Sequence, residues 1–77
     1  MNDATSRARG LLADALELEP DEIREDASME TVGEWTSLGH MRLVLALEQT
    51  LGRELDPAAI VDIASLKDIE TLLQSGA

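Results

Sequence analysis

The stretch of sequence that decides the fold spans residues 35–48 and reads Trp-Thr-Ser-Leu-Gly-His-Met-Arg-Leu-Val-Leu-Ala-Leu-Glu. A polar start and an apolar continuation are typical of a loop that passes into a helix. Thr36 or Ser37 can cap this helix by accepting a hydrogen bond from a backbone N–H that has no partner inside the helix. A hydroxyl here also lies beside the positive end of the helix dipole, which favours a phosphate ester. Without further context, Ser37 is more simply explained as a cap.

The helix that follows is predicted to run from Ser37 to about Leu51, and Gly52 is placed to end it in a left-handed conformation. Its apolar positions cover more of the helix surface than one core-facing stripe requires. They are Leu38, Met41, Leu43, Val44, Leu45, Leu47 and Leu51. Some of these side chains should therefore remain exposed, and exposed aliphatic side chains on a small protein indicate an interaction surface.

Before this helix, apolar residues three and four positions apart predict another helix from Ala4 to about Leu18, because Pro20 cannot continue a helix. A long acidic connection then runs from Pro20 to Thr36. A connection of this length usually packs or functions in its own right. The apolar residues expected to anchor it in the core are Ile23, Ala27, Met29 and Val32.

After the central helix, Asp56 and Pro57 predict the start of a short third helix, since Asp is a good cap and Pro suits the first helical position. Ser65 and Asp68 resemble a capping box in front of a last helix, which Gly76 is expected to end. The sequence thus predicts an all-α four-helix bundle with a long loop between the first two helices. We expect residues 1–77 to form a single domain.

Composition narrows the possible functions. Trp35 is the only aromatic residue, so the core must be aliphatic, and the lack of cysteine excludes disulfides, thiolate metal sites and cysteine nucleophiles. A net charge of −10 argues against nucleic-acid binding and suits partners with basic patches. The apolar runs are too short to span a membrane, and the N-terminus lacks a signal-peptide pattern, so we expect a cytoplasmic protein.

Metal binding and hydrolysis are not favoured by the pattern of side chains. The acidic loop lacks the ligand spacing and central glycine of a calcium site, and no carboxylates stand at ligand spacing from His40, so we expect no metal site. His40 follows Ser37 by three residues, which allows a Ser–His pair to be imagined. Such a nucleophile also needs a group that orients the base and an oxyanion hole, and none is evident. We therefore expect no enzyme activity.

Residues 36–48 carry a family resemblance. Thr36-Ser37-Leu38, followed by Met41, Leu43, Val44, Ala46, Leu47 and Glu48, resembles the D-S-L-x-x-V-x-L-V-x-A-L-E signature of acyl carrier proteins. The loop segment Asp26-Ala27-Ser28 and the order of the helices also match, so the resemblance covers nearly the whole chain. Thr36 departs from the family's usual aspartate. The W-x-S-L-x-H form resembles stand-alone carriers outside primary fatty-acid synthesis.

This resemblance implies that Ser37 carries a 4′-phosphopantetheine arm, taken from coenzyme A, whose thiol holds an acyl or aminoacyl group as a thioester. It implies a monomeric carrier for a specialised pathway, of fatty-acid or polyketide type. The implied partners are a phosphopantetheinyl transferase and the enzymes that load and transfer the cargo. We predict that these partners recognise Thr36, Leu38, Met41, Arg42 and Leu45. Between Thr36 and Gly52 the only charged residues are Arg42 and Glu48, whereas half of the acidic residues lie between Glu17 and Glu34.

Trp35 and His40 are expected near the arm. For His40 we expect an exposed helix position that can reach the phosphate. For Trp35 the favoured interpretation is a hydrophobic plug over the bundle, and the alternative is a side chain that flanks the arm. For the whole chain, the alternative function is a noncovalent helical interaction module without a prosthetic group, with the apolar stripe as its docking face. A small hydrolase that uses Ser37 is a weaker alternative.

Overall fold

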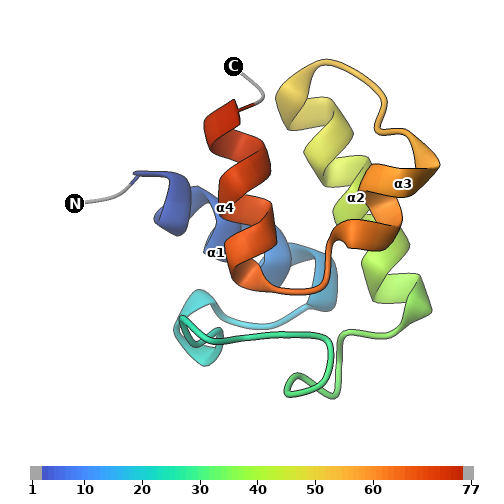
Figure 1. The fold of residues 1–77 in the computed structure, drawn as a ribbon. Helices are drawn as coiled ribbons and strands as arrows, with labels where there is room; N and C mark the ends of the chain where they lie inside the picture. The colour runs from blue at the N-terminus through green and yellow to red at the C-terminus, as the bar shows by residue number, and fades with distance from the viewer. Residues whose placement is uncertain (1–2, 76–77) are drawn as a thin grey trace.

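The computed structural model of the protein describes residues 3–75. Within this range it contains four α-helices, α1 (Asp3–Leu16), α2 (Ser37–Leu51), α3 (Pro57–Asp62) and α4 (Leu66–Ser75), and the short 3-10 helix η1 (Pro20–Glu22) in the long connection. α1 packs against both α2 and α4, and the short α3 lies beside α2 (Figure 1). The predicted all-α four-helix bundle is confirmed. Gly76, expected to end α4, lies outside the described residues.

The core is aliphatic, as the composition predicts. The largest fully buried side chains come from α1, α2, α4 and the segment before α4, and they are Leu12, Leu43, Leu47, Ile63, Leu66, Ile69 and Val44. Burying one such side chain contributes about 1.5–3 kcal/mol. In contrast, α3 buries none of its own residues, and the chain is anchored on either side of it by Leu55 and Ile63.

The end of α1 differs from the sequence prediction. The helix stops at Leu16 rather than near Leu18, because Glu17 adopts a left-handed conformation with φ 61°. The backbone N–H of Leu18 donates to the carbonyl of Ala13 over 2.8 Å, and that of Glu17 donates to the carbonyl of Asp14 over 3.3 Å. This is the Schellman pattern of helix termination, which glycine usually adopts at the left-handed position. A glutamate at this position carries some backbone strain, and the sequence therefore does not indicate that the helix ends here.

The long connection has structure of its own. η1 carries a capping box between Glu19 and Glu22, and Ile23 and Ala27 are buried as predicted. Met29 does not follow the prediction, because the residue is 40% exposed. Its backbone provides the anchor instead, since the Met29 N–H donates to the carbonyl of Ala64 over 2.9 Å. The connection is thus tied to the segment between α3 and α4.

The predicted caps of the later helices are present. Gly52 ends α2 with φ 73°, and the Asp56 carboxylate accepts from the N–H of Ala59 over 2.8 Å at the start of α3. Before α4, Ser65 Oγ accepts from the Asp68 N–H over 3.3 Å. In a regular capping box, the Asp68 side chain would accept from the backbone N–H of Ser65 itself. Here the Asp68 carboxylate accepts instead from the backbone N–H of Ala64, one residue earlier, over 2.9 Å. These local signals position α3 and α4 as the sequence indicates.

Candidate modification site at the start of helix α2

Thr36, rather than Ser37, caps α2. Its backbone is extended, with φ −91° and ψ 178°, and its Oγ1 accepts from the N–H of Gly39 over 3.2 Å. Ser37 is therefore the first helical residue, and its side chain is exposed. No hydrogen bond engages the Ser37 hydroxyl within the part of the chain that the structure describes. The hydroxyl is thus free of a capping role and open to a partner.

The surroundings of this hydroxyl fit a phosphodiester. It lies at the N-terminus of a helix of 15 residues, where the macrodipole and the first-turn N–H groups favour negative charge. The first turn of α2 contains no acidic side chain, so no like charge of this turn opposes a phosphate. The site can therefore accept a phosphate ester on Ser37.

Gly39 allows the start of α2 to press against the end of α1. A Cβ atom on Gly39 would lie 2.5 Å from Leu16 Cδ2 and 3.3 Å from the carbonyl oxygen of Glu34. Both Gly39 and Leu16 are buried. The absence of a side chain at Gly39 thus sets how closely the Ser37 turn sits on the bundle.

His40 is not the exposed side chain that was expected. It is half-buried, and both ring nitrogens have partners: Nδ1 accepts from Trp35 Nε1–H over 3.0 Å, and Nε2 lies 2.9 Å from the carbonyl oxygen of Ile60. Because the indole N–H can only donate, Nδ1 must accept and Nε2 must carry the proton that goes to Ile60. Neither nitrogen is available as a base for Ser37, which removes the basis for the hydrolase alternative.

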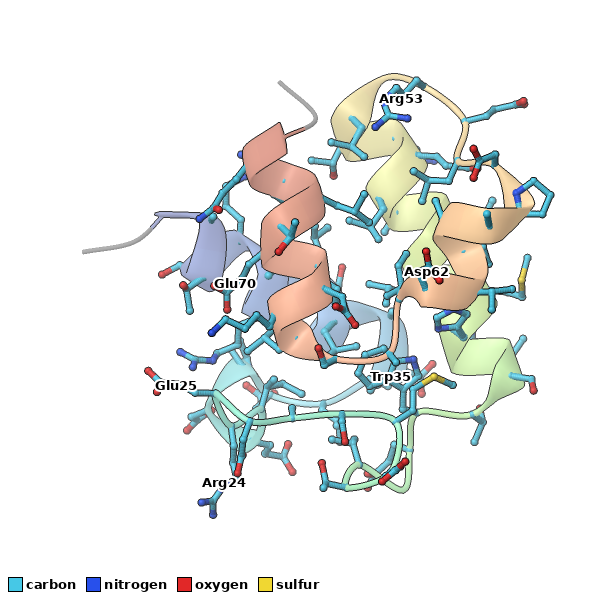
Figure 2. The ribbon with its side chains drawn as sticks, viewed as in Figure 1. Arg24, Glu25, Trp35, Arg53, Asp62 and Glu70 are labelled. Atoms are coloured by element: carbon cyan, nitrogen blue, oxygen red, sulfur yellow. The ribbon has the colours of Figure 1, made fainter. Side chains whose placement is uncertain are left out.

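Trp35 is buried, with 4% of its surface exposed, as the plug interpretation predicts. It points inward from the long connection toward the segment between α3 and α4 (Figure 2). Its ring stacks against that of His40, with centroids 6.1 Å apart and planes inclined by 28°. The sequence did not indicate this pairing of Trp35 with His40, although the two residues are only five positions apart.

The residues predicted for partner recognition all lie on the surface. Leu38, Met41 and Leu45 are 62%, 49% and 57% exposed, and their spacing of three and four positions places them on one face of α2. Thr36 and Arg42 are exposed as well. Sequence reasoning missed Val61 of α3, which is 79% exposed. In the sequence, the exposure of Val61 could be predicted only from its place next to Ile60. A helix of six residues is too short to bury two adjacent apolar residues on one side.

Arg42 has a partner that the sequence did not reveal. Its Nη1 lies 3.1 Å from Glu17 Oε2, so this ion pair joins α2 to the left-handed residue that ends α1. The Arg42 side chain is about half exposed, at 48%, and that of Glu17 is mostly exposed, at 78%. An exposed pair of this kind contributes about 0–1 kcal/mol and holds its charges loosely. Arg42 remains accessible, but the charge it offers a partner is partly balanced by Glu17.

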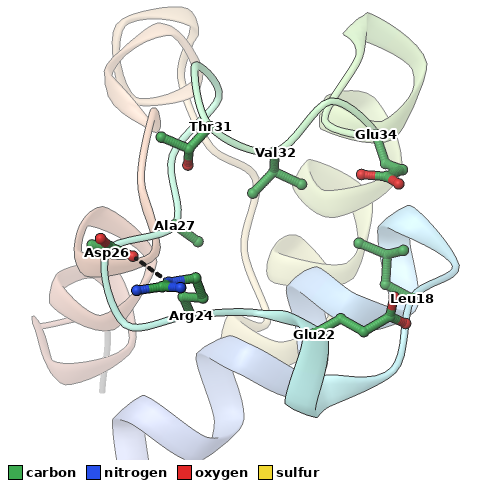
Figure 3. Close-up of a pocket in the computed structure, with 8 residues that line it drawn as sticks. All are labelled: Leu18, Glu22, Arg24, Asp26, Ala27, Thr31, Val32 and Glu34. Atoms are coloured by element: carbon green, nitrogen blue, oxygen red, sulfur yellow. Dashed lines mark hydrogen bonds and ion pairs between the residues drawn. The ribbon is translucent and has the colours of Figure 1, made fainter.

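Among the hollows in the described part of the chain, one borders the long connection and another borders α3. The first has a volume of about 290 Å³, and Figure 3 shows the Arg24–Asp26 ion pair on one side of it and Leu18 and Glu22 on the other. None of the predicted site residues lines it. The second, of about 230 Å³, is a groove between α3 and α4. Its lining residues are Ala59, Asp62, Ile63, Asp68, Thr71 and Leu72.

Residues 3–75 contain neither a metal-binding cluster nor a membrane-spanning helix. In that range no group of three or more histidine, aspartate or glutamate residues is placed to hold a metal ion. Nor does any helix there have the length and apolar character needed to cross a bilayer.

Comparison with known proteins identifies the family. The family described as "phosphopantetheine attachment site" matches residues 6–73, which include all of α2 and α3 and most of α1 and α4. No curated protein matches the sequence. Members of the family hold covalently attached 4′-phosphopantetheine and work with phosphopantetheinyl transferases and biosynthetic enzymes, without being enzymes themselves. The chain belongs to the phosphopantetheine-binding carrier proteins, as its resemblance to acyl carrier proteins implies.

Proposed function

We propose that Ser37 is the attachment residue and that the protein carries an acyl or aminoacyl thioester for a specialised biosynthetic pathway. One observation supports this assignment above the others. Thr36 performs the capping that would otherwise occupy a serine at this junction, and the exposed Ser37 hydroxyl has no hydrogen-bond partner in the described chain. A free hydroxyl at a helix start suits transfer of a phosphoryl-linked group.

In this proposal the Ser37 oxygen attacks the phosphorus of coenzyme A that bears the pantetheine. A P–O bond to Ser37 forms, the pyrophosphate bond breaks, and the adenosine 3′,5′-bisphosphate half leaves. The transferase must supply the base that takes the hydroxyl proton, because His40 is engaged with Trp35 and Ile60. Once attached, the arm supplies a terminal thiol that holds the cargo as a thioester. Tethering of this kind raises the effective concentration of cargo at each active site within reach.

The specialised assignment rests on the surface of α2. Primary fatty-acid carriers present an acidic recognition helix to basic enzyme surfaces, as the family resemblance implies. Here the exposed face of α2 offers Leu38, Met41 and Leu45, with Arg42 beside them. A basic patch on an enzyme would meet Arg42 unfavourably, and such like-charge contacts discriminate between partners. The loading enzyme should therefore dock through apolar contacts.

The test is the intact mass of the purified protein after incubation with a promiscuous phosphopantetheinyl transferase and coenzyme A. We expect wild type to gain one phosphopantetheine and Ser37→Ala to gain none. Ser65→Ala is the matched control, because it also removes a serine hydroxyl near a helix start and should still be modified. If neither a broad transferase nor one from the native host modifies wild type, the attachment proposal fails. The apolar stripe of α2 would then serve a noncovalent interaction module.

A further inference from the structure

α3 is held in place by few contacts of its own. It has six residues, none of them buried, and helices this short are unstable without support from the rest of the protein. Ala59 and Ile60 are half-buried, and Leu55 and Ile63 anchor the chain on either side. The position of α3 against α2 therefore depends on the few directed contacts that reach it.

His40 supplies one of these contacts at the C-terminal end of α3. The carbonyl of Ile60 belongs to the last turn, where a helix leaves its carbonyls without internal partners. The N–H four residues on, that of Ala64, donates to Asp68 instead. His40 Nε2–H donates to this Ile60 carbonyl over 2.9 Å. A side chain of α2 thus caps the C-terminal end of α3.

Trp35 fixes the histidine for this role. Its indole N–H donates to Nδ1 over 3.0 Å, which places the imidazole proton on Nε2, facing Ile60. The indole is itself held, because it is buried and the Trp35 backbone N–H donates to the carbonyl of Val32 over 3.0 Å. The hydrogen-bonded series thus runs from the buried core through the His40 ring to the backbone of α3.

The place where His40 joins α2 to α3 suggests a role for the Trp35–His40–Ile60 hydrogen bonds. Met41 directly follows His40 in α2, Val61 directly follows Ile60 in α3, and both apolar residues are exposed. We infer that Trp35 and His40 are positioning residues that hold α3 against α2, so that Val61 joins Leu38, Met41 and Leu45 in one apolar face for the carrier's partner enzymes. This inference extends the proposed function, because it assumes that partners reach Ser37 across α2.

The experiment compares three variants with wild type by two readouts. His40→Leu removes both hydrogen bonds, Trp35→Phe removes the donor that orients the ring together with part of the buried indole, and Val61→Ala shortens the apolar face without touching either bond. Gln49→Ala, at an exposed position on α2, is the control. The first readout is amide hydrogen exchange, helix by helix. The second is kcat and KM for modification of Ser37 by a broad phosphopantetheinyl transferase.

We expect His40→Leu to speed exchange in α3 by about twofold to tenfold, the range that the loss of one hydrogen bond produces, while α1 and α4 exchange as in wild type. Its KM should rise by a similar factor with kcat unchanged. Trp35→Phe should shift both quantities in the same direction by less. Val61→Ala should raise KM and leave exchange unchanged, and Gln49→Ala should alter neither.

Unchanged α3 exchange in both His40→Leu and Trp35→Phe would overturn the inference. So would a fall in kcat without a change in KM, or faster exchange in every helix, because these results indicate catalytic or general structural effects. If His40→Leu does not fold, Trp35→Phe carries the same test. Failure of the proposed function is distinguishable, since wild type would then not be modified at Ser37 while the exchange readout would still report on α3.

Discussion

The hydroxyl of Thr36 accepts a hydrogen bond from the backbone N–H of Gly39 over 3.2 Å, and this contact leaves the neighbouring Ser37 hydroxyl outside the cap. The two adjacent hydroxyls therefore have separable roles. Replacement of Thr36 should affect stability, and replacement of Ser37 should affect modification. The usual aspartate of the family's signature could accept the same N–H, so Thr36 preserves the cap without the negative charge.

The first prediction separates these roles. Thr36→Ala should lower the free energy of unfolding by about 0.5–2 kcal/mol through loss of the cap and should still be modified. Ser37→Ala should change stability by no more than about 0.5 kcal/mol, as is usual for a surface substitution, and should lose modification completely. Urea denaturation and intact mass measure the two effects. Equal destabilisation by both variants would show that the capping assignment is wrong.

The second prediction concerns two glycines in helices. At Gly39 a new Cβ meets Leu16 in the core, so Gly39→Ala should destabilise the protein, because overpacking costs about 1–3 kcal/mol and outweighs the gain in helix propensity. At Gly10 of α1 nothing lies within 4 Å of the added atom, so Gly10→Ala should stabilise by about 0.5–1 kcal/mol. Chemical denaturation of the two variants side by side provides the measurement. A stabilised Gly39→Ala would mean that Leu16 moves aside freely.

The third prediction concerns the charge of Arg42. Arg42→Glu should weaken loading by the cognate enzyme and improve use by a fatty-acid synthase transacylase, because it removes a charge that opposes basic enzyme surfaces. Glu17→Gln is the matched control, since it breaks the 3.1 Å ion pair while keeping the arginine. Loading rates with both enzymes distinguish the two effects. If Glu17→Gln reproduces the change seen with Arg42→Glu, the ion pair and not the charge is responsible. If wild type already serves the fatty-acid enzymes as well as their own carrier does, the specialised assignment is wrong.

The fourth prediction concerns shelter of the cargo. Helices packed through aliphatic side chains can separate more readily than helices packed through aromatic rings, so an acyl chain attached to the arm can enter between them. The groove of about 230 Å³ between α3 and α4 is a candidate point of entry. Each buried methylene should contribute up to about 0.8 kcal/mol, so the melting temperature should rise with acyl length. Thermal unfolding of the bare-arm form and of short and long acyl forms checks this. Equal melting temperatures would indicate a polar or very small cargo that stays outside.

The fifth prediction uses Trp35 as a reporter, since it is the only tryptophan. Because its ring is buried and donates to His40, its emission spectrum should stay unchanged when the arm is attached. Fluorescence before and after modification, with circular dichroism to follow helicity, provides the measurement. A clear shift at constant helicity would place the arm against the ring and favour the alternative interpretation of Trp35.

The sequence by itself determined which segments form helices and where most of them begin. Amphipathic spacing, Asp56 before Pro57, and Gly52 after α2 act within a few residues of the chain, so their effects can be predicted without tertiary contacts. The aliphatic core and the width of the apolar surface of α2 follow from the same local pattern. So does the choice of Ser37 as the residue of interest, although the sequence left open whether Ser37 or its neighbour serves as the cap.

Tertiary structure decided which side chains meet across the fold. The pairs Arg42–Glu17 and His40–Ile60 join residues 25 and 20 positions apart, and no periodicity encodes such contacts. Glu17 ends α1 early in a left-handed conformation. Glycine is the residue usually found at such a position, so the sequence did not predict this helix end. The half-burial of His40 and the exposure of Val61 likewise depend on where α3 lies. Local sequence patterns predict the helix face on which a residue lies. Which residues from other segments pack against that face depends on the tertiary arrangement of the helices.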